Sequence, residues 1–184
     1  MEGLSRSWLG PSGFRGWTTV GDRVAGGFEF QWALTGSGWA TYRITDGVSE
    51  HSDVPSYCTD ALADLLAGVA GLYGSEAPQR VSFDMEPAEV RWVLRAAGKT
   101  VTIDIHRFPD LHHSSRLPDG DGECVWSSVQ PRRVVAHAVL EAAQGLLDRH
   151  GAKGYLKKWA EHPFPAAELG ELRRLHRERD DCAH

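Results

Sequence analysis

The feature that most constrains the fold is a set of three short segments between Arg80 and Phe108 in which apolar and polar residues alternate. The apolar positions are Val81, Phe83, Met85, Val90, Trp92, Leu94, Val101, Ile103 and Ile105. A period of two is typical of β-strands buried on one face. Turn signals at Glu86-Pro87 and Ala97-Gly98 separate the segments, so we expect an antiparallel meander. Because strands covered on both faces are continuously apolar, its second face is expected to meet water or a partner.

Other segments give weaker but similar signals. Residues 28–34 and 39–45 alternate on either side of Gly36-Ser37-Gly38, which predicts a hairpin, and Asp46-Gly47 marks the next turn. A short strand is expected over residues 124–129. Apolar residues at helical spacing predict helices near residues 59–73 and 131–149, the second running to Gly151, and a final charged helix around Leu169, Leu172 and Leu175.

The order of strands, helix, strands and helices favours the α+β class. We expect a single domain with an antiparallel twisted β-sheet of five to seven strands and helices packed on one face. A parallel sheet would need a helix between each pair of strands. Residues 28–184 make up this domain and its C-terminal helical tail. Residues 1–27 form a Gly-rich N-terminal arm, either loosely ordered or pinned by its aromatic residues.

Composition narrows the possible partners. The formal net charge of -5 argues against nucleic-acid binding and suits a basic partner or simple solubility. No apolar run reaches the roughly 20 residues of a membrane span. The three cysteines have no motif spacing and no signal peptide precedes them, so we expect reduced thiols and a cytoplasmic location. Arginine outnumbers lysine 16 to 4, a hint of a GC-rich bacterial genome.

Two apparent ligand motifs fail on inspection, and we expect no cofactor. Gly98-Lys99-Thr100 resembles the end of a phosphate-binding loop, but Val93 stands where the first glycine belongs and a strand follows instead of a helix. A hairpin turn is the better interpretation. Asp119, Asp121 and Glu123 resemble a calcium loop, but Cys124 replaces its obligatory glycine.

The polar face of the meander holds the main candidates for a site. They share the polar register of their strands and are Asp84, Glu86, Glu89, Arg91, Arg95, Asp104 and His106. One interpretation is a solvated face with cross-strand ion pairs. The other is a platform for a ligand or protein, whose binding residues are Asp84, Glu86, Arg91, Arg95, Asp104 and His106. Arg91, Asp104 and His106 are then the catalytic candidates.

Histidine and cysteine add minor candidates. His106, His112 and His113, with Asp104 or Asp110, are the nearest approach to a metal site, although adjacent histidines rarely converge on one ion. Cys58 precedes the first predicted helix, where a helix dipole can lower a thiol pKa and make a nucleophile, so Cys58 is a further catalytic candidate. Packing under the helix start is the simpler role.

Seven tryptophans are many for this length. Trp32, Trp39 and Trp92 alternate with polar residues and are expected in the core. Trp8, Trp17, Trp126 and Trp159 lie near predicted turns and tails, and are the candidates for a partner surface.

These observations favour a non-catalytic protein-binding module, such as an inhibitor or immunity-type partner that offers its acidic surface and sheet face to another protein. The alternative is a small enzyme or ligand-binding domain with a pocket between the polar sheet face and the 109–123 loop. The sequence does not give the oligomeric state.

Overall fold

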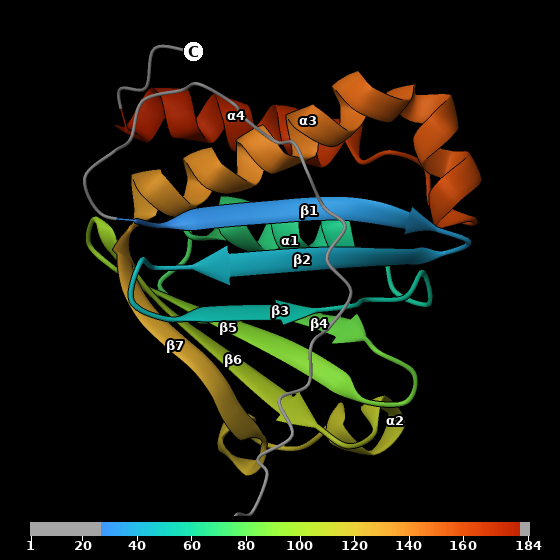
Figure 1. Ribbon diagram of the computed structural model, residues 1–184. Coiled ribbons are helices and arrows are strands. Elements are labelled where there is room, and N and C mark those ends of the chain that lie inside the picture. Colours follow the sequence, from blue (N-terminus) through green and yellow to red (C-terminus); the bar gives the residue numbers. More distant parts are fainter. Residues whose placement is uncertain (1–26, 181–184) are drawn as a thin grey trace, which may run out of the picture.

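The computed structural model describes residues 27–180, in which two antiparallel sheets are combined with helices (Figure 1). The first sheet has the order β1-β2-β3, with β1 at Glu29–Gly36, β2 at Trp39–Thr45 and β3 at Glu50–Asp53. The second has the order β4-β5-β6-β7, with β4 at Gln79–Asp84, β5 at Glu89–Ala97, β6 at Thr100–Phe108 and β7 at Glu123–Pro131. The helices are α1 (Ala61–Gly71), α2 (Leu111–Ser114), α3 (Arg132–Trp159) and α4 (Ala166–Asp180), with a single 3₁₀ turn, η1, at Asp119–Asp121.

The α+β class is confirmed, but the single sheet is wrong. The strands divide into sheets of three and four because β4 pairs with β5 and not with β3. Between β3 and β4 the chain forms α1, so the two strands are not joined as a hairpin. One backbone contact crosses between the sheets near this point, where Ser56 N donates to the Asp84 carbonyl at 2.8 Å.

The apolar faces of the two sheets meet in an aromatic core. Tyr42 of β2 and Trp92 of β5 pack edge-on with ring centroids 5.3 Å apart, and Trp92 Nε1 donates to the Tyr42 hydroxyl at 3.3 Å. Trp32 packs edge-on against Phe83 at 5.8 Å. Such pairs stabilise a core by about 0.5–1.5 kcal/mol beyond the burial of their area. The alternation of apolar and polar residues gives each sheet one apolar face, and these two faces pack against each other.

The tryptophans follow the prediction only in part. Trp32 and Trp92 are buried as expected, and Trp39 is half-buried. Trp126 and Trp159 were expected at a partner surface, and that prediction is wrong, since they are 5% and 0% exposed. Trp126 faces the core from β7, and Trp159 packs against Trp32 at the end of α3. Trp8 and Trp17 lie outside the described residues, as does most of the predicted arm.

Most predicted elements are confirmed with shifted ends. The meander is β4-β5-β6, in which Trp92 pairs with Val81 on one side and Ile105 on the other. The predicted stop at Gly151 is a kink with φ 62° and ψ 166°, after which α3 continues. β3 was not predicted, because Glu50, His51, Ser52 and Asp53 contain no apolar residue.

Three of the helices, α1, α3 and α4, form a layer beside the sheets (Figure 1). α3 runs along β1, while α1 packs between β4 and α4. In α1 the buried side is made by Leu62, Leu65, Leu66 and Val69, at the spacing expected of an amphipathic helix. Across residues 27–180, none of the helices combines the length and the apolar character needed to cross a membrane.

Candidate functional site

The polar face of the four-stranded sheet is partly covered by the segment that follows β6. Residues 109–123, with α2 and η1, fold back over β4 and β5, as contacts to Arg91 and Arg80 show. As a result Glu89 is 0% and Arg91 is 4% exposed. The expected open platform is therefore closed over these two residues.

Glu89 and Arg91 form the centre of a buried hydrogen-bond network. Arg91 Nε and Nη2 donate to the two Glu89 carboxylate oxygens at 2.9 and 3.0 Å. The same guanidinium donates to the Ser114 carbonyl at 2.7 Å and to the Leu117 carbonyl at 2.9 Å. The hydroxyls of Ser82 and Ser114 donate to Glu89. We call this set, with Asp119 and Arg80, the Glu89–Arg91 network.

Asp119 extends the network to the surface. It accepts from Arg91 Nη1 at 3.2 Å and from Arg80 Nε at 2.9 Å. The Arg80 hydrogen bond holds the pKa of Asp119 below its usual value, with Arg91 adding to the effect. Burial alone would raise the pKa of Glu89, but the bonds from Arg91, Ser114 and Ser82 outweigh burial and keep that pKa low. Each charge in the network has a partner, and its hydrogen bonds hold the 109–123 loop against the four-stranded sheet.

Of the other residues of the predicted platform, Arg95 reaches this network, since its Nη2 lies 3.9 Å from Asp119 Oδ2. Arg95 pairs with Asp104, which also accepts from the Ser127 hydroxyl at 2.6 Å. His106 Nδ1 lies 3.4 Å from the Gly122 carbonyl oxygen. Asp84 and Glu86 lie at the β4–β5 turn. The structure therefore links Glu89, Arg91, Arg95 and Asp104 through Asp119, and leaves His106 and the pair Asp84 and Glu86 outside that network. The ligand pocket under the 109–123 loop stays a prediction.

The histidines of the possible metal site do not come together. His112 and His113 are exposed on α2, whose start is capped by the Asp110 carboxylate accepting from both of their backbone amides. In the part of the chain that is described, no three or more His, Cys, Asp or Glu side chains are placed to hold a metal ion.

Cys58 is exposed and lies two residues before the N-cap Asp60 of α1. The side chain of Ser56 lowers the pKa of the Cys58 thiol by hydrogen bonding. Burial and the Glu86 carboxylate, 3.5 Å from Sγ, outweigh this effect and raise the pKa overall. That direction opposes the activation that a nucleophilic thiolate requires.

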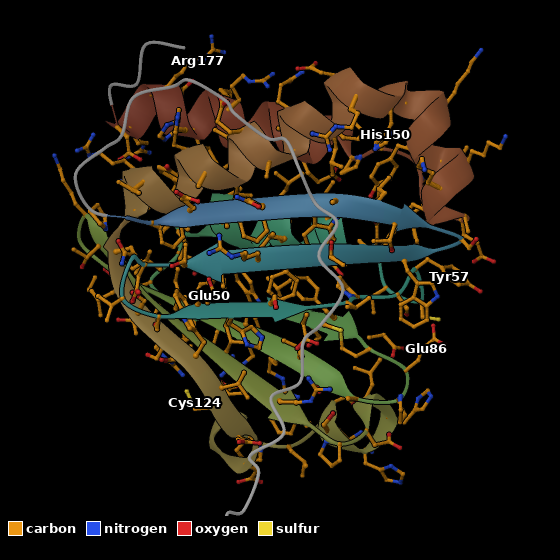
Figure 2. The ribbon with its side chains drawn as sticks, viewed as in Figure 1. Glu50, Tyr57, Glu86, Cys124, His150 and Arg177 are labelled. Carbon is orange, nitrogen blue, oxygen red and sulfur yellow. The ribbon has the colours of Figure 1, made fainter. Side chains whose placement is uncertain are left out.

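Asp84 and Glu86, two of the predicted binding residues, lie near Cys58 and belong to a larger group of carboxylates that extends to the start of α1 and that the sequence did not bring together. We call it the acidic end; its members are Asp60, Asp64, Asp84, Glu86, Glu161 and Glu168. Figure 2 shows Tyr57 and Glu86 on the right-hand side of the molecule, near the β1–β2 turn. His162, which follows Glu161, contacts the Tyr57 carbonyl at 2.9 Å and Asp60 Oδ2 at 3.6 Å.

The charges of the acidic end are poorly compensated. Within residues 27–180 its carboxylates form no ion pair with lysine or arginine, and the imidazole of His162 is the one basic side chain beside Asp60. Burial and the neighbouring Glu168 raise the pKa of Asp60, while burial and Asp60 raise that of Asp64. Asp64 and Glu168 lie in the first turns of α1 and α4, where helix dipoles favour carboxylates. A position in the first turn of a predicted helix is the only sequence feature that could have indicated Asp64 and Glu168.

Two small hollows lie elsewhere, on the α3–α4 side. One of about 30 Å³ is lined by His137, Gln144, Arg173 and His176 among others, and one of about 160 Å³ by Lys99, Pro131, Arg133, Arg179 and Asp180. Both are smaller than the roughly 300–1,000 Å³ typical of sites for small organic ligands.

Comparison with known proteins adds no assignment: no family model, curated protein or solved structure matches the chain.

Proposed function

We propose that the chain is a non-catalytic protein-binding module, of inhibitor or immunity type, and that its acidic end binds a basic surface of a partner protein. The observation that supports this most directly is the gathering of six carboxylates without a lysine or arginine partner in the described chain. Bringing a partner's cations to these groups would relieve their repulsion, which gives the partner electrostatic complementarity.

The surface also offers an aromatic anchor. Tyr57 is half-buried, and its ring lies so close to Gly38 that a Cβ added there would be 2.4 Å from Tyr57 Cδ1. Its ring is thus held in place among the charges by the β1–β2 turn. Fixed tyrosines surrounded by polar groups are frequent among residues that dominate binding energy.

The test is capture of a partner from native lysate by the full chain, its identification by mass spectrometry, and calorimetry with the purified partner. The informative variant is Glu86→Lys/Glu161→Lys, because both residues are exposed and lie outside helices. The matched control is Glu76→Lys/Glu123→Lys, which reverses two exposed charges away from the acidic end.

We expect the first variant to weaken binding at least about tenfold, with a weaker dependence on salt, and the control to bind like the wild type. Equal affinities of the two variants, or a partner whose binding does not depend on salt, would refute the proposal.

A further inference from the structure

The larger hollow is lined by cations from three different elements. Lys99 belongs to the β5–β6 turn, Arg133 to the first turn of α3, and Arg179 to the last turn of α4. Figure 1 shows these three points close together on the left of the view, away from the right-hand side on which Figure 2 labels Tyr57 and Glu86. In the described range, 27–180, none of the three cations has an ion pair with a carboxylate.

Asp180 also lines the hollow, but its charge is already compensated. Its Oδ1 accepts from Arg132 Nη2 at 2.9 Å, and its Oδ2 accepts from the Tyr73 hydroxyl at 2.6 Å. The Arg132 guanidinium lies over the Tyr73 ring, 4.3 Å from the centroid. The Asp180 side chain is 5% exposed, so the hollow presents the positive charge of Lys99, Arg133 and Arg179.

The start of α3 adds to this positive field. No side chain caps the helix at Pro131, and its first turn contains no acidic residue. Arg132 N donates to the Lys99 carbonyl at 2.8 Å, which holds the β5–β6 turn against the helix start. The first N–H groups of a helix lack intrahelical partners, and with the helix dipole they favour an anion. The Gly98-Lys99 turn thus lies beside a helix start that is distant in sequence.

We propose that this hollow binds a phosphoryl group, either as free phosphate or as the end of a small phosphate monoester. A volume of about 160 Å³ suits one such group better than a whole organic molecule. Lysine, arginine and helix amides are the donors that bind phosphate oxygens most strongly. The cations are also gathered against the net charge of -5 of the whole chain. This proposal does not depend on the function of the acidic end.

The test is titration of the ¹⁵N-labelled full chain with inorganic phosphate and with phenyl phosphate, followed by amide NMR shifts. We expect saturable shifts at Lys99, Arg133 and Arg179. Lys99→Gln and Arg133→Gln should each weaken binding about tenfold. Lys157→Gln removes an exposed charge near the other end of α3 and should leave binding unchanged. If phenyl phosphate binds more tightly than inorganic phosphate, the ligand of the hollow is a phosphate monoester. If it binds equally or more weakly, the ligand is free phosphate.

The absence of saturable shifts would overturn the proposal, as would equal weakening by Lys99→Gln and Lys157→Gln. Asp181 follows Asp180 in the sequence, so Asp181→Asn is included. Binding seen only in Asp181→Asn would assign the hollow to that carboxylate and would also overturn the proposal.

Discussion

The Glu89–Arg91 network and the acidic end both gather carboxylates, but they differ in what surrounds them. In the network, the 0% exposed Glu89 accepts hydrogen bonds from a guanidinium and two hydroxyls. At the acidic end, exposed carboxylates such as Asp64 and Glu86 have no lysine or arginine partner within residues 27–180. Buried charges are retained when they are fully paired, whereas unpaired charges survive at a surface. Pairing therefore lets the network stabilise the fold, whereas the exposed carboxylates of the acidic end are expected to contribute little to it.

The largest expected effect comes from breaking the network. Arg91→Met leaves Glu89 buried without its bidentate partner and should lower the free energy of unfolding by about 3–5 kcal/mol. Urea denaturation measures this. The double variant Glu89→Leu/Arg91→Met removes both charges and should recover most of the loss. If the double variant is less stable than Arg91→Met, the pairing argument fails.

The second effect is a loss of stability at acidic pH, caused by protonation of Glu89 and Asp119. The folded-state pKa values of Glu89 and Asp119 lie below their usual values, so both groups contribute stability above the unfolded pKa and lose it as pH falls through the folded pKa. The free energy of unfolding should therefore decrease on acidification below about pH 4.5. The decrease should be smaller in Glu89→Leu/Arg91→Met. Parallel pH profiles of the two proteins would contradict the assignment.

The smallest effect has the opposite sign and belongs to the acidic end. Because the folded-state pKa of Asp64 is raised, its ionised form costs stability above the unfolded pKa, and this cost vanishes when the group is protonated. Asp64→Asn should therefore stabilise the protein at pH 7 by about 0.5 kcal/mol or less, as expected for an exposed charge. Thermal unfolding at pH 7 and pH 3 measures the gain and its loss. A destabilised variant at pH 7 would show that the helix dipole dominates instead.

The periodicity of apolar residues predicts local elements of the fold, but it does not predict contacts between residues that are distant in sequence. Alternation in β4, β5 and β6 fixed their pairing because each has one apolar face. It could not report that residues 109–123 return to cover the polar face, because that depends on contacts between residues distant in sequence, such as Arg91 and Ser114. The division into two sheets was missed for the same reason.

The sites show the same limit. Arg91 was selected for its charge in a polar register, but periodicity did not indicate that its guanidinium is buried against Glu89 and two carbonyls of the 109–123 loop. The acidic end draws Asp60, Glu86 and Glu168 from separate elements, and the hollow at Lys99 joins a turn to a helix start more than 30 residues later. Only tertiary structure brings such residues together.

The most direct test of the distinction between the two regions is the free energy of unfolding of Glu86→Lys/Glu161→Lys, the variant that is expected to lose the partner. We expect a value within about 0.5 kcal/mol of the wild type, because exposed charges contribute little to stability. A loss of several kcal/mol, comparable to that of Arg91→Met, would show that the acidic end stabilises the fold as the Glu89–Arg91 network does, and the two regions would then not differ.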